Sequence, residues 1–186
     1  MILELDKIIK GCKKRKRKSQ AALYEHTVDD LMNICIRYLG NSQFSKDALQ
    51  NVYLKAFQKI DTYDTTKGSI GAWLAKITVN ECLIIIRKKK RILFLDNIKG
   101  ESPLTTDEDV VSSLSANEIY EEIKNMPDGY RIIFNLYVVE GYNHTEIGKA
   151  LGITASSSRS QLTRAKNYLR KAITQKSKLS VYEKAK

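Results

Sequence analysis

The sequence predicts an all-α protein built from two small helical domains, a helical bundle and a helix-turn-helix, joined by a flexible linker. Apolar residues recur at spacings of three and four along most of the 186-residue chain, which is the period of an α-helix. Glycine and proline, which interrupt helices, number only 9 and 2. One stretch in the middle of the chain lacks the helical period, so the predicted helices fall into two groups.

The first group of helices occupies residues 1–94. The predicted helices run from about Leu23 to Leu39, from Ser45 to Ile60, and from Ile70 to beyond Ile84. Gly40 marks the end of the first of them, and the polar loop of residues 61–69 separates the second from the third. The basic run Lys13–Lys18 precedes these helices, and we expect it to be a solvated extension of the first one.

The second group of helices occupies residues 115–176 and is followed by a short tail, residues 177–186. The linker before it, residues 95–114, is rich in Ser and Thr and contains a proline and the acidic cluster Asp107–Asp109. The first predicted helix of this group begins at Ser115. Three more run from Tyr130 to Glu140, from Asn143 to Leu151, and from Thr154 to about Ala172. Capping-box spacings at Ser115 with Glu118 and at Asn143 with Glu146 support two of these starts.

The charge balance favours a polyanionic partner. The chain has 32 Lys and Arg against 21 Asp and Glu, a formal net charge of +11, which favours nucleic acid or an anionic membrane surface. No stretch reaches the roughly 20 apolar residues that a membrane span needs, and the N-terminus lacks the pattern of a secretory signal. We therefore expect a cytoplasmic protein without membrane insertion.

Residues that could carry catalysis or hold a metal are sparse. The three cysteines, Cys12, Cys35 and Cys82, form no CxxC pair, and the two histidines lie far apart in the sequence. This pattern predicts no disulfide, no metal site, no cofactor and no catalytic residue, so the chain is not expected to be an enzyme.

Residues 145–169 have the pattern of a helix-turn-helix. The positions expected to face inward are Ile147, Ala150, Leu151, Leu162, Ala165 and Leu169. The opposite face of the second helix carries Ser156, Arg159, Ser160 and Thr163, with Arg164 at its flank. Small hydroxyl side chains permit close approach to base edges, and arginines donate to guanine or phosphate. The alternative is a plain helical hairpin with a solvated basic face.

A second basic surface is predicted on the third helix of the first group. Lys76, Asn80, Arg87 and Arg91 fall within an arc of about 60° on a helical wheel, and Lys88–Lys90 extend the stripe. Such a stripe is suited to a phosphate backbone, and the preceding 61–69 loop offers Tyr63 to hold an unstacked base. An ordinary solvated face is the alternative, and Trp73 is expected to be a core residue.

Two blocks of the sequence resemble the sigma-70 family. The stretches that are similar to conserved region 2 are 23–24, 47–57 and 72–80. The stretches that are similar to region 4 are 140–142, 146–147, 151–153 and 159–166. Both blocks occur in the order and spacing of the extracytoplasmic-function (ECF) sigma factors, and together they cover about four-fifths of the chain.

The resemblance implies a subunit that binds core RNA polymerase and directs it to promoter DNA for transcription initiation. Residues 1–94 correspond to the region 2 domain and 115–176 to the region 4 domain. The implied contacts with core polymerase are Asp47, Gln50, Asn51 and Lys55. The implied contacts with the single-stranded -10 element are Tyr63, Lys76, Asn80, Arg87, Lys88 and Arg91. The implied contacts with the duplex -35 element are Ser156, Arg159, Ser160, Thr163 and Arg164.

Further implications concern partners and the linker. Free members of the family often bind an anti-sigma factor, which is therefore a further expected partner. The acidic cluster of the linker would follow the RNA exit path of the polymerase, where Asp107–Asp109 mimic RNA charge. The sequence departs from the family pattern at Asn51 (usually Glu), Ile84 (often Asp) and Ser158 (usually Val). A stand-alone helix-turn-helix regulator, which binds duplex DNA without polymerase, is the alternative function.

Overall fold

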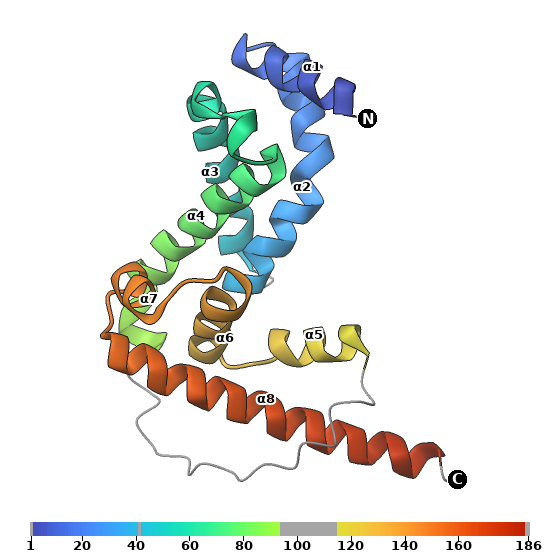
Figure 1. Cartoon of the computed structure of the whole chain (residues 1–186), viewed down its shortest axis with the longest axis vertical. Helices are drawn as coiled ribbons and strands as arrows, with labels where there is room; N and C mark the ends of the chain where they lie inside the picture. Colours follow the sequence, from blue (N-terminus) through green and yellow to red (C-terminus); the bar gives the residue numbers. More distant parts are fainter. Residues whose placement is uncertain (1, 41, 94–114, 185–186) are drawn as a thin grey trace. The chain divides into compact units, whose positions relative to one another are not determined.

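The computed structural model describes residues 2–40, 42–93 and 115–184, and all regular elements in these ranges are helical (Figure 1). The N-terminal elements are α1 (Ile2–Lys13), α2 (Arg17–Leu39), α3 (Gln43–Lys59), η1 (Ile60–Thr62), η2 (Thr65–Lys67) and α4 (Ile70–Leu93). The C-terminal elements are α5 (Ala116–Lys124), α6 (Asp128–Phe134), η4 (Asn135–Val139), α7 (His144–Leu151) and α8 (Ala155–Lys184). The elements η1 and η2 are 3-10 turns, and η4 is a π-helical turn. The all-α prediction is confirmed.

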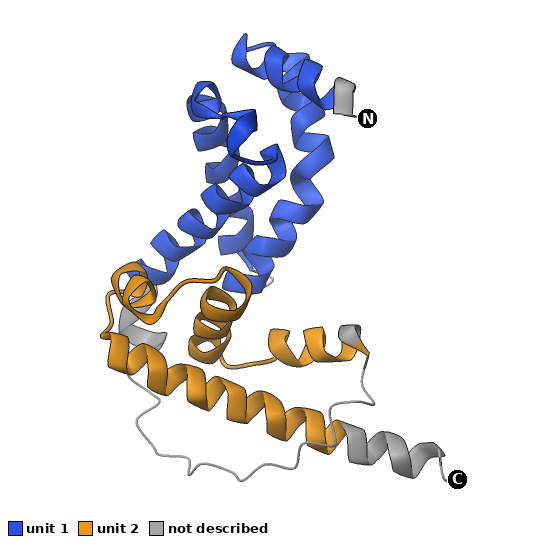
Figure 2. Ribbon diagram, viewed as in Figure 1, with its two compact units in different colours: residues 1–88 blue, residues 89–186 orange. Residues whose placement is uncertain are grey.

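The chain divides into two compact units, residues 1–88 and residues 89–186 (Figure 2). The predicted linker, residues 95–114, lies outside the described residues together with its acidic cluster. The last helix is longer than expected, because α8 continues to Lys184 and does not end near Ala172. Beyond that point Ile173 is buried and Lys176 Nζ lies 2.9 Å from Glu122 Oε1 of α5, so tertiary contacts prolong the helix.

Helix α1 is an element that the sequence analysis did not predict, since its first helix was expected to begin near Leu23 with the basic run as an extension. The basic run Lys13–Lys18 contains the turn between α1 and α2, where Arg15 adopts a left-handed backbone with φ 56°. The two helices approach closely at Gly11, where an added Cβ would lie 2.0 Å from Ser19 Oγ. The run shows no Gly or Pro, which is why the sequence pattern hides the turn.

Helices α2, α3 and α4 bury the apolar stripes that the sequence predicted. The largest fully buried side chains of this unit are Tyr38, Leu23, Ile60, Leu74, Ile86 and Val52. One polar contact joins α2 to α3 within this core, since Thr27 Oγ1 lies 2.8 Å from Tyr53 Oη. The remaining hydroxyl capacity of Thr27 is used on its own helix, where it donates to the Leu23 carbonyl at 2.7 Å. Burial of polar groups is tolerated here because they are paired.

The helix starts of the second unit follow their local sequence signals. Both predicted capping boxes are present, with Ser115 and Asn143 as the capping residues. Gly152 ends α7 with a left-handed backbone at φ 64°, as expected for a helix stop. Helix α6 begins at Asp128, two residues before the expected Tyr130, and the carboxylate of Asp128 in the first turn is favourable at a helix N-terminus.

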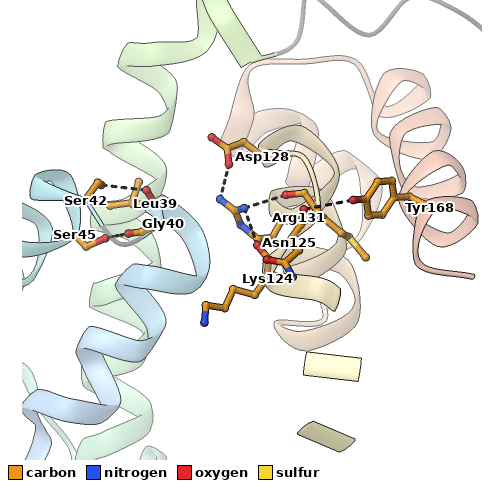
Figure 3. A network of polar contacts seen from close by, with 10 residues as sticks. Leu39, Gly40, Ser42, Ser45, Lys124, Asn125, Asp128, Arg131 and Tyr168 are labelled. Atoms are coloured by element: carbon orange, nitrogen blue, oxygen red, sulfur yellow. Dashed lines mark hydrogen bonds and ion pairs between the residues drawn. The ribbon is translucent and has the colours of Figure 1, made fainter. Parts of the chain in front are cut away.

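Arg131 on α6 fixes the turn between α5 and α6 (Figure 3). The side chain is buried, and its guanidinium donates to the carbonyls of Lys124 at 3.2 Å and Met126 at 3.0 Å. A third bond reaches Asp128 Oδ1 at 2.5 Å. In the first unit the turn from α2 to α3 is closed similarly by hydroxyls, since Ser45 donates to the carbonyl of Gly40 (Figure 3). The bonds to Lys124, Met126 and Gly40 satisfy backbone carbonyls at or just after a helix end, and the bond to Asp128 pairs the buried guanidinium with a carboxylate.

Candidate nucleic-acid surfaces and protein-binding groove

The predicted basic stripe lies on the solvent face of α4. Lys76, Asn80, Arg87 and Lys88 are all exposed. The inner face of the same helix buries Val79, Cys82, Leu83 and Ile86. Arg91 belongs to α4, but its side chain lies outside the described residues. The helix therefore presents a polar and basic surface over at least three turns.

The 61–69 loop is held by bonds within itself. Asp64 Oδ1 accepts from the Thr66 amide at 2.9 Å and from the Thr66 hydroxyl at 2.7 Å. These hydrogen bonds lower the pKa of the Asp64 carboxyl, so it stays ionised and keeps the η2 turn capped. A neighbouring lysine, Lys67, places its Nζ 3.8 Å from Asp64 Oδ2. These bonds define the conformation of the loop around Asp64.

The side chain of Tyr63, within this loop, points into the core. The sequence analysis expected its ring to be available to a base. Its side chain is only 6% exposed and its ring centroid lies 5.6 Å from that of Trp73. The Tyr63 hydroxyl donates to the Gly68 carbonyl at 3.0 Å, and burial raises its pKa. The ring turns inward because it gains apolar packing and a hydrogen bond there together.

Helix α3 carries the predicted polymerase contacts. Asp47, Gln50 and Asn51 are exposed, and Gln43 donates to Asp47 at 3.0 Å. Lys55 is placed differently, because its Nζ lies 2.5 Å from Glu81 Oε1 of α4. The Glu81 side chain is 8% exposed and that of Lys55 is 43% exposed. Lys55 therefore compensates a buried carboxylate.

An apolar groove lies between α2 and α3, beside these polar residues, and the sequence analysis missed it. It has a volume of about 500 Å³, and its walls are formed by Tyr24, Met32, Lys46, Leu49, Gln50, Tyr53, Leu54 and Phe57. Leu54 is 56% exposed and Tyr24 is 44% exposed, although both are apolar side chains. The sequence feature that could have predicted the groove is Leu54, an apolar residue that lies outside the buried stripe of α3.

The helix-turn-helix comprises α7, the turn at Gly152 and the start of α8. Ile147 and Leu151 of α7 and Leu162 and Ala165 of α8 are buried, as predicted. On the outer face of α8 the residues Ser156, Arg159, Ser160 and Thr163 are exposed, and Arg164 is half-buried. The Thr154 hydroxyl accepts from the Ser157 amide at 3.0 Å and so supports the start of α8.

A polar pair of a half-buried histidine and a buried serine joins α7 to α8. His144 Nδ1 lies 3.0 Å from Ser158 Oγ, and Ser158 is fully buried. The His144 ring also stacks on Tyr137 with ring centroids 4.7 Å apart. Burial lowers the pKa of His144, and the positive charges of Arg159 and Lys166 lower it further. A serine at this inward position thus seats α8 through a hydrogen bond rather than through apolar packing.

The described residues contain no group of His, Cys, Asp or Glu side chains that could hold a metal ion. All three cysteines are free and buried. Burial raises the pKa of the Cys12 thiol, which therefore stays protonated. Among the helices within the described ranges, none has the length and apolar character required to cross a membrane.

Comparison with known proteins matches both units to one family. The model of Sigma-70 region 2 matches residues 23–92, and that of Sigma-70 region 4 matches residues 116–169. The chain is 30% identical over 185 residues to the ECF RNA polymerase sigma factor SigW of Bacillus subtilis, covering 93% of this chain and 98% of that protein. It is 26% identical over 154 residues to SigE of Mycolicibacterium smegmatis, covering 80% of this chain and 59% of that protein.

A solved structure is also similar, namely the sigma factor RpoE in complex with the anti-sigma factor NepR from Bartonella quintana. The identity is 18%, the TM-score is 0.45, and the match covers 82% of this chain and 95% of that one. The two family matches and the likeness to SigW along nearly the whole chain agree with each other. The chain therefore belongs to the sigma-70 family as an ECF sigma factor, which binds core RNA polymerase and directs it to promoters for transcription initiation.

Proposed function

We propose that the two units divide the work of a sigma factor between a region 2 domain, residues 1–94, and a region 4 domain, residues 115–176. The first binds core polymerase and captures the opened -10 element, and the second reads the -35 element as duplex DNA. The linker of residues 95–114 joins them. The polymerase carries out catalysis, so this subunit needs no active site of its own. Because the polymerase lies in the cytoplasm, the subunit acts there too.

The groove between α2 and α3 is the observation that carries the proposed contact with core polymerase. Its apolar side chains share the wall with the polar Lys46 and Gln50, and Asp47 and Asn51 are exposed on the same helix, a combination of apolar and polar groups that is found in protein interfaces. An apolar groove between two helices is the kind of surface that binds an amphipathic helix, such as one from the coiled coil of the largest polymerase subunit. Lys55 contributes by holding α3 to α4 through Glu81.

The -10 element is proposed to bind along α4 and the 61–69 loop. Lys76, Arg87 and Lys88 are exposed and would follow phosphates, and the exposed Asn80 would donate to a base. Arg91 would extend this track by one further turn of α4. The Tyr63 ring is buried and its hydroxyl donates to the Gly68 carbonyl, so the ring is not available to a base. We therefore expect the exposed polar groups of the loop to hold the base.

The -35 element is proposed to bind the outer face of α8. Ser156, Ser160 and Thr163 are small enough to let the helix approach base edges in the major groove. Arg159 is exposed and could donate to a base or a phosphate, and the half-buried Arg164 lies at the flank of the same face. This arrangement corresponds to a recognition helix whose N-terminal turns contact the DNA.

An anti-sigma factor is the proposed regulatory partner. The groove leaves Leu54 and Tyr24 exposed in the free protein, and exposed apolar surface favours association. A partner that covers the groove would compete with core polymerase for the same residues. Release of that partner would then make the sigma factor available.

Two single substitutions separate the proposed surfaces. Leu54→Asp places a charge in the groove and should weaken binding to core polymerase by at least ~10-fold, while binding of the -35 duplex is retained. Arg159→Ala should weaken -35 recognition by roughly 1–3 kcal/mol and leave core binding unchanged. Core affinity is measured by fluorescence anisotropy, and -35 recognition by competition between promoters with intact and altered -35 sequences.

Matched controls lie on the same helices. Lys59→Ala removes an exposed charge from α3 outside the lining of the groove, and Lys171→Ala removes an exposed charge from α8 beyond the recognition turns. Both should have less than about a threefold effect, because positions outside the central contacts of an interface contribute little to binding. If Leu54→Asp left core binding intact, or if Arg159→Ala left the -35 preference intact, the corresponding surface would be assigned wrongly.

A further inference from the structure

The basic turn between α1 and α2 contacts the segment that leads from α3 into the 61–69 loop. The guanidinium of Arg15 donates to the Phe57 carbonyl and to Asp61 Oδ2, the latter at 2.7 Å. Lys13 Nζ donates to the Tyr63 carbonyl at 3.0 Å. Three points along one stretch of seven residues, from Phe57 to Tyr63, are therefore held by a turn that lies more than 40 residues earlier in the sequence.

The bond to Phe57 satisfies a backbone group that a helix end leaves open. Helix α3 ends at Lys59, so the Phe57 carbonyl belongs to its last turn, where the carbonyls have no α-helical turn beyond them to donate. A cation is also favoured at this end by the helix dipole. The Arg15 side chain thus acts as a C-cap that is supplied from another helix, and Figure 1 shows α1 at the same end of the unit as the segment after α3.

The backbone of Arg15 gives an independent reason to assign it a role. Its φ of 56° is the only left-handed value among the non-glycine residues that the structure describes. This conformation follows the end of α1, where glycine is the usual residue because it adopts it without strain. An arginine kept in a strained position indicates that its side chain does something there that glycine would not do.

We propose that Arg15 and Lys13 are positioning residues for the -10 element, which fix the 61–69 loop in the form that receives the flipped base. The proposal rests on the proposed function of that loop. The ion pair of Arg15 with Asp61 is exposed, with 50% and 58% of the two side chains accessible, so it contributes little to overall stability. Its effect is instead to reduce the number of conformations that the free loop adopts, which lowers the entropy cost of binding a base.

The variant Arg15→Gly separates positioning from stability. Glycine relieves the left-handed strain, so the midpoint of thermal unfolding should not fall. The loop loses its two tethers at Phe57 and Asp61, so opening of a duplex promoter by the complete holoenzyme should slow by ~10-fold. Opening is followed by permanganate reactivity of -10 thymines, and core binding is measured alongside and should not change.

A pre-opened template provides the readout that a purely structural defect would not produce. Once the -10 region is already single-stranded, Arg15→Gly should start transcription within about twofold of the parent, because part of the cost of capture is removed. Hydrogen exchange of the Tyr63 and Lys67 amides, which bond to the carbonyls of Ile60 and Asp64, should quicken in the free protein. Lys13→Met should give the same pattern with a smaller effect.

Lys14→Ala and Lys18→Ala are the controls, since each removes one positive charge from the same exposed run. If they slow opening as much as Arg15→Gly does, the run acts through charge alone and the proposal is wrong. Unchanged loop exchange in Arg15→Gly also contradicts it. If Thr66→Ala with Lys67→Ala leaves the -10 preference intact, the function proposed for the loop fails, whereas the exchange result still decides whether Arg15 orders it.

Discussion

Several polar side chains in this protein have structural roles that their residue type alone does not predict. Arginine, lysine and serine usually lie at the surface, yet Arg131 and Ser158 are buried and each is satisfied by hydrogen bonds. Lys55 balances the charge of Glu81. In each case a polar group is kept inside because a specific partner offsets the cost of removing it from water.

His144 gives the region 4 unit a pH dependence whose direction is fixed by its surroundings. The folded-state pKa is lowered, by burial first and then by Arg159 and Lys166. The unfolded chain, with a histidine pKa near about 6.5, therefore takes up a proton before the folded one does. The stabilising contribution is present above that pH, and it is lost as the pH falls through the folded-state pKa.

The variant His144→Gln checks this expectation. Between pH 7.5 and pH 5.5, hydrogen exchange in α7 and α8 should show a larger loss of stability in the parent than in the variant, because glutamine does not titrate. Exchange is the suitable probe, since the only tryptophan, Trp73, lies in the other unit and reports on that unit alone. Equal losses in both proteins would contradict the assigned environment of His144.

At the scale of elements, the sequence predicted the helix starts that depend on residues close by in the chain. Ser115 and Asn143 were identified as helix caps because their partners lie three residues away. The structure adds what depends on distant residues: the inward turn of Tyr63 onto Trp73, the pair of Lys55 with Glu81, and the groove beside Leu54. Periodicity reports which face of a helix is apolar, but not which other helix covers it.

Helix α1 illustrates the same limit and yields a prediction. Gly11→Val should destabilise unit 1 by about 1–3 kcal/mol, since the new side chain would collide with Ser19 of α2 and overpacking carries a cost of that size. Urea unfolding followed by Trp73 fluorescence measures the change.

The matched control is Gly71→Ala on α4, where an added Cβ meets only Ser69 Oγ at 3.9 Å. That variant should be as stable as the parent or more so, because alanine favours a helix over glycine. A Gly11→Val protein with unaltered stability would show that α1 does not pack on α2 at this point.

At the scale of the whole molecule, two separate units and a net charge of +11 fit a protein that touches DNA at two places while another protein does the chemistry. Opening a promoter costs roughly 1.4 kcal/mol per base step, whereas holding one flipped base returns about 1–3 kcal/mol. A single loop therefore cannot open a promoter, and the polymerase must supply the remaining free energy. This difference explains why the chain functions as a specificity subunit.

The most direct test of this account combines the purified full chain with its cognate core polymerase and a library of promoter fragments. The account predicts a stable complex that starts transcription at defined sites sharing two conserved elements, while neither component alone does so. It would be contradicted if the chain formed no complex with core polymerase and yet bound a specific duplex site by itself, which is the behaviour of a stand-alone helix-turn-helix regulator.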